Sequence, residues 1–249
     1  MIRKKTQEEI QRLAAAGHVL GGILDVLVAT AAVGVTGNQL NTIAEKMIAD
    51  AGAQPVFKGY GEPPFPASIC ISINQQVVHG IPNNVPFQEG DIVSIDAGLS
   101  LGGMIVDSAR TVGVGAITDE YVRLLAVTKQ ALVVGIAQAL PGSPVGNIGH
   151  AIQEYVEGEG FEVVRKLVGH GVGFELHEEP QVPNFGLAGL GPVLQEGMVI
   201  AIEPMVTIGS PDVDTADDGW GIVAISGKSA AHEEHTIAIT KSGPVILTA

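Results

Sequence analysis

An internal repeat constrains the fold of this chain more than any other feature of its sequence. The pattern E-G-x-apolar-apolar-x-I-acid occurs at residues 89–96 and again at residues 196–203. An H-x-x-P element precedes each copy, and an acidic residue closely followed by Thr comes after each copy. Three elements in the same order predict two structurally related halves. A pseudo-twofold arrangement of these halves would bring the terminal acids of the two copies, Asp96 and Glu203, to face each other.

The two halves, about residues 1–115 and 116–249, are expected to form a single domain, because no linker-like segment separates them. Of the 249 residues, 46% are hydrophobic and only 16% are charged, so the chain can bury a large core. The 27 acidic residues outnumber the 13 Lys and Arg residues. Nucleic acid is therefore not expected as a partner, because binding to its backbone needs clustered basic side chains.

The cysteine content and hydropathy bear on where the protein works. Cys70 is the only cysteine, so no intrachain disulfide can form and a cytoplasmic location is expected. The apolar stretch 19–35 is shorter than the roughly 20 residues of a membrane span and contains Asp25. We therefore expect it to form a buried helix and expect no association with a membrane.

Local patterns predict a chain of mixed helices and strands. Two capping boxes, Thr6 to Glu9 and Thr36 to Gln39, each precede an apolar pattern at helical spacing. Further helices are expected over 118–140 and 145–160, a loop over 56–66, one strand over 68–78, a strand pair over 91–114, and strands and loops over 161–249. The fold class is therefore α+β.

Two acids, Asp96 and Asp107, flank the turn signal Leu101-Gly102-Gly103 within the predicted strand pair. A reversal centred on Leu101 and Gly102 would place these acids directly opposite each other, with Cβ atoms about 5 Å apart. Like charges that close require a shared proton, a basic partner or a metal ion. A solvated hairpin with two incidental acids is the simpler alternative, but the apolar residues on both sides predict buried strands.

His170 lies between glycines in the segment 169–173, where missing side chains would let a ligand or ion approach the backbone. Imidazole adds affinity for Mn, Fe, Co or Zn to a set of carboxylates. The candidate set is Asp96, Asp107, His170, Glu203 and Glu234. It contains too many carboxylates for a structural zinc site, and two adjacent divalent ions bridged by carboxylates fit it better.

At these residues the chain closely resembles the type I methionine aminopeptidases, which are metallopeptidases of the pita-bread fold. The resemblance covers nearly the whole chain. The matching segments are 68–74, 78–82, 90–93 with Asp96 and Asp107, 169–173, 177–180, 202–205 and 234–236. The resemblance implies a curved antiparallel sheet covered by helices, two pseudo-symmetric halves, and metal ligands at the same five residues.

The implied reaction is removal of the initiator Met from nascent polypeptides by metal-activated water, with two ions drawn from Co, Mn, Fe or Zn. Glu203 would shuttle the proton, His177 would stabilise the oxyanion, and His79 would bind the scissile amide or the next residue. By resemblance the substrate pocket comprises Tyr60, Phe65, Cys70, His79, Leu176, His177 and Trp220. The family also implies transient work at the ribosome, and we expect a monomer.

Two departures from the family pattern stand near these residues. Glu233 occupies a position where many relatives have an aromatic residue, and strand alternation predicts that it points away from the metals. Leu176 replaces a frequent Phe, which predicts a wider pocket.

Two other functions are compatible with the same fold. A related peptidase could cleave X-Pro bonds, although such relatives usually carry a large additional N-terminal domain, for which 249 residues leave no room. A catalytically inactive homologue could bind peptides, although such proteins normally lose metal ligands, and all five candidates are present here.

Overall fold

The computed structural model describes residues 2–249. The helices are α1 (Gln7–Thr30), α2 (Gly37–Asp50), α3 (Asp119–Gln138) and α4 (Gly146–Gly158). The strands are β1 (Gln54–Pro55), β2 (Ile69–Ile73), β3 (Gln76–Val78), β4 (Ile92–Leu101), β5 (Met104–Gly113), β6 (Glu162–Val163), β7 (Gly169–Gly171), β8 (Glu178–Val182), β9 (Val199–Ile202), β10 (Met205–Thr207), β11 (Val213–Thr215), β12 (Ile222–Ala224), β13 (Ala230–His232), β14 (Glu234–Thr240) and β15 (Gly243–Ile246).

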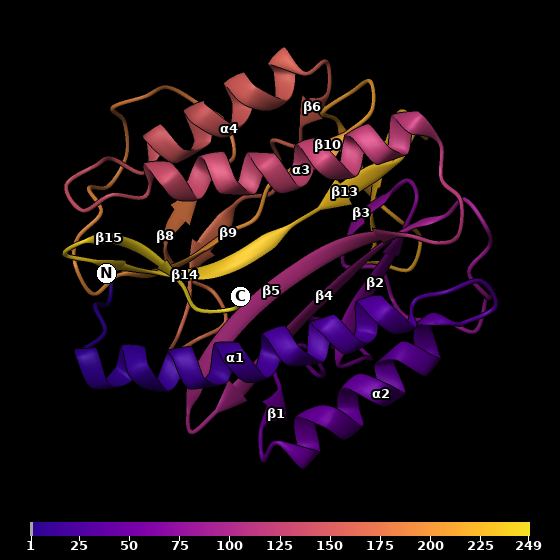
Figure 1. Ribbon diagram of the computed structural model, residues 1–249, viewed down its shortest axis with the longest axis horizontal. Coiled ribbons are helices and arrows are strands. Elements are labelled where there is room, and N and C mark those ends of the chain that lie inside the picture. The colour runs from indigo at the N-terminus through magenta and orange to yellow at the C-terminus, as the bar shows by residue number, and fades with distance from the viewer. Residues whose placement is uncertain (1) are drawn as a thin grey trace.

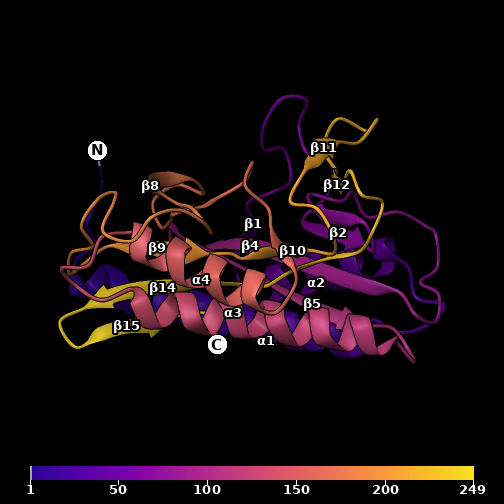
Figure 2. The same cartoon turned by 90° about the horizontal axis from the view of Figure 1, so that it is seen from above.

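A large antiparallel sheet forms the centre of the molecule (Figure 1). Its strand order is β1-β4-β5-β14-β9-β7-β8, with β2 also paired to β4 and β15 to β14. Figure 2 shows α1 and α3 along one side of this sheet, with β11 and β12 on the other. The predicted α+β class and curved, helix-covered sheet are confirmed, and the architecture is the pita-bread fold.

The predicted helix starts are confirmed in detail. Thr6 and Thr36 accept hydrogen bonds from the backbone N–H of the third helical residue, and the side chains of Glu9 and Gln39 complete both capping boxes. Thr118 likewise caps α3 through the backbone N–H of Tyr121. Each box satisfies backbone donors that have no partner within the helix, so it fixes where the helix begins.

Helix α1 is long and apolar enough to cross a membrane by length and composition alone. In the structure it packs against β4 and β5, and Leu20, Leu24 and Leu27 on its inner face are fully buried. The core helix of a globular domain passes the same length and composition test, and this packing is the buried helix that the sequence predicted.

Two sequence predictions about the strands are wrong. The segment 68–78 forms two strands, because Asn74 has a φ of 54° and turns the chain between β2 and β3. The β4–β5 turn is centred on Gly102 and Gly103, whose φ angles of 58° and 77° are those of a two-residue turn with both central residues at positive φ. Leu101 therefore pairs with Met104 and belongs to the strands.

This shift changes how the two hairpin acids face each other. Asp96 lies opposite Ala109, and Asp107 lies opposite Gly98, so the acids are diagonal neighbours and not a directly opposed pair. They still project from the same face, because the offset is two residues and side chains alternate with a period of two.

The hydrophobic core has two main clusters. One joins α1 and α2 to β2 and β4, and the other joins α3 and α4 to β9 and the C-terminal half of β14. We propose that these clusters are the cores of two related halves, with the boundary near residue 115 between β5 and α3.

Candidate metal centre

A cavity of about 150 Å³ is lined by residues of the large sheet and of the loops beside it. All the residues that the sequence and the resemblance assigned to a site line this one cavity. They are Tyr60, Phe65, Cys70, His79, Asp96, Asp107, His170, Leu176, His177, Glu203, Trp220 and Glu234. Five further residues complete the lining: Phe57, Val78, Leu167, Val168 and Met205.

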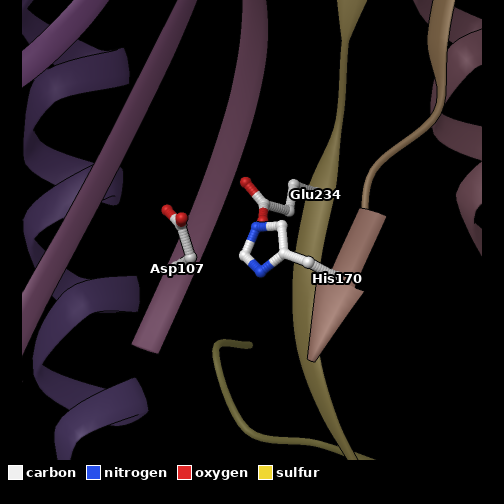
Figure 3. Close-up of side chains that lie close together, drawn as sticks. All are labelled: Asp107, His170 and Glu234. Atoms are coloured by element: carbon white, nitrogen blue, oxygen red, sulfur yellow. The ribbon is translucent and has the colours of Figure 1, made fainter. Parts of the chain in front are cut away.

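Three of the predicted ligands form a compact group. Figure 3 shows Asp107, His170 and Glu234, which come from β5, β7 and β14. One ligand atom from each of these buried side chains lies within 4.8 Å of the others. Two carboxylates and one imidazole at this spacing suit a divalent transition metal ion.

Asp96 and Glu203 lie beside this group and line the same cavity. Asp96 projects from β4, and Glu203 follows β9 directly. The Oε1 atom of Glu203 lies 3.5 Å from Nε2 of His170. Both side chains are therefore adjacent to the compact group without belonging to it.

The donor atoms fit a metal ion, because they are buried and lack other partners. Within the described residues, Asp96 Oδ1, Asp107 Oδ1 and Glu234 Oε1 have no hydrogen-bond partner. Leaving a buried polar atom unpaired costs about 1–3 kcal/mol, so three such oxygens in one cavity indicate a missing cation. The clustered carboxylates of a metal site have this property.

The pKa values of the acids in the metal-free protein reflect their burial and the short distances between their carboxylates. Burial raises the pKa of Asp96 to about 7, and burial with the neighbouring carboxylates raises the pKa of Asp107 and of Glu234 well above the ordinary range. Glu203 differs, because the imidazoles of His232 and His170 outweigh its burial and lower its pKa. Glu203 is thus the acid of the cluster most readily ionised without a metal.

The glycines beside His170 make room for neighbouring backbone, and the predicted space for an ion is not what they provide. A Cβ atom on Gly169 would lie 2.4 Å from the carbonyl oxygen of Ala201, and one on Gly171 would lie 2.3 Å from that of Glu179. These glycines therefore admit the backbones of the neighbouring strands and do not open space for an ion. They let β7 lie close between β8 and β9.

His79 and His177 both reach the cavity from loops that precede or follow short strands. The ring of His177 lies 4.4 Å from that of His170, and its Nδ1 is 2.6 Å from the hydroxyl of Tyr60. Burial and His170 lower the pKa of His177 to about 4, and burial lowers that of His79. Both imidazoles are therefore neutral at pH 7 and can each donate one hydrogen bond.

The wall of the cavity away from the acids is apolar. Phe57, Phe65, Cys70 and Leu176 form a small buried cluster against which Trp220 packs. The Phe65 and Trp220 rings meet edge to face, with centroids 5.2 Å apart. The cavity thus joins an acidic, metal-competent end to an aromatic pocket.

His232 is the residue whose place the sequence least predicted. It is 1% exposed, its Nε2 lies 3.6 Å from Oε2 of Glu203, and neither ring nitrogen has a hydrogen-bond partner within the described chain. Its position two residues before Glu234 was the only signal, since alternate residues of a strand share a face. Glu233 points the other way, as predicted, and accepts a hydrogen bond from the backbone N–H of Thr111.

Buried carboxylates and an imidazole beside an apolar pocket suit a metal-dependent hydrolase that holds an apolar side chain of its substrate. The sequence comparisons agree. The model of metallopeptidase family M24 matches residues 11–241, and the chain belongs to this family.

The relatives specify the resemblance further. A methionine aminopeptidase of Clostridium perfringens is 49% identical over all of this chain and 99% of its own length. Methionine aminopeptidase 1 of Bacillus subtilis is 48% identical over similar coverage. The crystal structure of the Thermotoga maritima methionine aminopeptidase is 42% identical, with a TM-score of 0.97 over all of this chain and 99% of that one. The resemblance to the methionine aminopeptidases is confirmed.

Proline-specific peptidases share the fold at a greater distance. The prolidase of Pyrococcus furiosus has a TM-score of 0.81 and is 24% identical, and this chain covers only 65% of it. The X-Pro alternative is not favoured, because the full-length relatives at 48% to 49% identity are named methionine aminopeptidases.

Proposed function

We propose that this chain is a methionine aminopeptidase that removes the initiator Met from nascent polypeptides. The observation that carries the proposal is the junction, in one cavity, of a metal-competent acidic cluster and an apolar pocket. The full-length relatives that share 48% to 49% identity are named for this activity.

Asp96, Asp107, His170, Glu203 and Glu234 would hold two divalent ions, drawn from Co, Mn, Fe or Zn. When bound, the ions supply the Lewis acid and the activated water of peptide hydrolysis. The number of donors supports two ions rather than one. Asp107, His170 and Glu234 form the compact group, and Asp96 and Glu203 remain beside it as additional donors.

Glu203 accepts the proton of the attacking water and returns it to the leaving amine. Its lowered pKa keeps it ionised at neutral pH, which a proton acceptor requires. No other acid of the cluster has a lowered pKa, because burial dominates in Asp96, Asp107 and Glu234.

His177 donates a hydrogen bond to the carbonyl oxygen as negative charge develops there. When the Tyr60 hydroxyl is the donor in its 2.6 Å contact with Nδ1, the neutral ring carries its hydrogen on Nε2 and can donate it into the cavity. His79 binds the scissile amide or the following residue.

The Met side chain occupies the pocket formed by Tyr60, Phe65, Cys70, Leu176 and Trp220. Thioether sulfur contacts aromatic edges favourably, and the Phe65 and Trp220 rings supply such edges in this pocket. The free α-amine then lies at the acidic end, which makes the reaction that of an exopeptidase.

We further place this protein in the cytoplasm as a monomer that meets its substrates near the ribosome. The single buried thiol of Cys70 suits a reducing compartment.

Metal replacement tests the function directly. The protein is treated with a chelator, each divalent metal is added back in turn, and release of Met from Met-Ala-Ser is measured beside cleavage of Gly-Pro. We expect metal-dependent turnover of Met-Ala-Ser. Turnover of Gly-Pro alone would show an X-Pro peptidase, and binding of peptides without turnover would show an inactive homologue.

Substitution of Glu203 tests the mechanism. Glu203→Ala should lower kcat by at least about 100-fold while the protein stays folded, because general acid–base groups contribute about that much or more. Glu196→Ala, at an exposed acid that begins the same repeat segment, serves as the matched control. Unchanged activity of Glu203→Ala would contradict the assigned role.

A further inference from the structure

The loop that carries His177 is tied to the segment before the first helix. Residues 172–177 connect β7 to β8 and contribute Leu176 and His177 to the cavity. Leu176 packs in the apolar cluster, whereas the next side chain, His177, has an exposed surface and contacts the Tyr60 hydroxyl and the His170 ring. Core packing therefore holds one point of this loop, and polar contacts hold its two ends.

Glu178 organises the loop from within. Its Oε1 accepts hydrogen bonds from the backbone N–H groups of Phe174, at 2.6 Å, and Glu175, at 3.0 Å. Its side chain is only 2% exposed. The carboxylate thus closes the loop on itself immediately after His177.

Lys5 anchors that carboxylate to the rest of the molecule. Its Nζ donates to Oε2 of Glu178 at 2.8 Å, and the two side chains are 1% and 2% exposed. The backbone N–H of Lys5 donates to the carbonyl oxygen of Gly197, so the lysine is fixed at both ends. Its stem crosses Gly173, where an added Cβ would lie 2.5 Å from Lys5 Cε.

Arg3 adds a second, weaker contact. Its guanidinium lies 2.8 Å from Glu175 and 3.4 Å from Glu178, and it also stacks over the ring of Phe174. Its side chain is 41% exposed, so solvent screens these contacts more than the Lys5 pair.

We propose that Lys5 is a positioning residue for the peptidase reaction, which acts through its buried ion pair with Glu178 to hold the loop that presents Leu176 and His177. This role rests on the proposed function of His177. A buried ion pair adds little net stability compared with apolar replacements, because desolvation of both charges offsets their attraction. Its value here is geometric, since a fixed carboxylate fixes two backbone groups of the loop.

The test compares two lysines that are adjacent in sequence. Lys5→Met removes the buried partner, and Lys4→Met makes the same change at an exposed side chain. Hydrogen exchange of residues 173–178, kcat and KM for Met-Ala-Ser, and metal affinity by titration calorimetry are measured for both variants.

We expect Lys5→Met to speed amide exchange in the loop and to lower kcat/KM by about tenfold, because displacement of a substrate contact by even about 1 Å is costly. Metal affinity should stay within twofold of the unchanged protein, because no predicted metal ligand lies in the loop. Lys4→Met should match the unchanged protein in all measurements. If the loop exchange of Lys5→Met equals that of Lys4→Met, the proposal is wrong.

Lys5→Met leaves the buried carboxylate of Glu178 without its cation, so this variant could fail to fold. A second variant avoids this problem. Lys5→Met combined with Glu178→Gln removes both charges, while the amide oxygen still accepts from Phe174 and Glu175. This double variant should fold and still exchange faster in the loop. Loop amide exchange equal to that of the unchanged protein would overturn the proposal. Because amide exchange does not depend on cleavage of Met-Ala-Ser, failure of the proposed function would be detected separately.

Discussion

His232 and Glu203 shift each other's pKa values. Glu203 is flanked by two imidazoles, with His170 Nε2 at 3.5 Å from one oxygen and His232 Nε2 at 3.6 Å from the other. Burial lowers the pKa of His232, but Glu203 and Asp96 outweigh it and raise that pKa. The ring therefore lies close to the Glu203 carboxylate, and we expect it to help orient that group.

Replacing this ring should weaken metal binding. His232→Met keeps the bulk and removes the donor, and we expect metal affinity to fall by about 10- to 100-fold, which is typical for residues that orient metal ligands. His232→Gln restores a donor at a similar reach and should recover most of the affinity. Chelator competition measures both variants, and equal affinities for Met and Gln would rule out the donor role.

The candidate ligands could be named from the sequence, and the structure gathers them at one cavity. The sequence places His232 beside the ligand strand, but it does not show the approach of this ring to Glu203. A lone buried histidine is usually a satisfied core residue, and only the structure shows that its ring nitrogens are unpartnered and face Glu203.

At the scale of elements, the glycines of β7 let this strand pack closely between its neighbours and so place His170. The strand has three residues and carries His170 between β8 and β9. The glycines at both ends were predicted to open space for an ion, but they make room for strand backbones. The prediction failed because a sequence does not reveal which neighbour approaches a glycine.

A side chain at this strand should separate it from its neighbour. Gly171→Ala would place a Cβ 2.3 Å from the carbonyl oxygen of Glu179, and we expect a loss of about 1–3 kcal/mol in the free energy of unfolding. Gly158→Ala, at the exposed end of α4 with nothing within 4 Å, is the control and should be neutral or slightly stabilising. Urea denaturation measures both, and equal stabilities would contradict the close-packing explanation.

The register of the β4–β5 hairpin depends on which two residues form its turn. The presence of the hairpin could be predicted, but its register was wrong by two residues. Both glycines occupy the two positive-φ positions of the turn, and the sequence Leu-Gly-Gly alone does not say which pair of residues turns. The error preserved the shared face of the two acids because the side-chain period is two.

At the scale of the whole molecule, the acidic cluster links folding to pH and to metal. In the metal-free protein the pKa of Asp96 is about 7, above its unfolded value of about 4. Asp96 therefore binds more protons in the folded state between these values, and its contribution to stability falls as pH rises from about 4 to about 7. Asp107 and Glu234, whose pKa values are also raised, extend the loss in the same direction.

A metal ion should reverse this behaviour, because it binds the deprotonated carboxylates. We expect the Tm of chelated protein, measured relative to that of chelated Asp96→Asn, to fall between pH 5 and pH 7.5, and the increase in Tm on adding Mn²⁺ to grow over the same range. Thermal melts with and without Mn²⁺ at several pH values measure the effect. Asp96→Asn should flatten the metal-free slope, whereas Asp217→Asn, on an exposed loop, should leave it unchanged. A slope that Asp96→Asn does not alter would mean that other groups cause it.

The sequence by itself determined where the capped helices begin, the α+β class and the candidate site residues, because capping boxes, strand periodicity and repeated motifs are local and are written in consecutive residues. The tertiary structure alone decided which atoms meet. It set the diagonal placement of Asp96 and Asp107, the approach of His232 to Glu203, and the tie from Lys5 to the loop of His177. These contacts join residues far apart in the chain, and only the packing of the sheet, helices and loops brings them together.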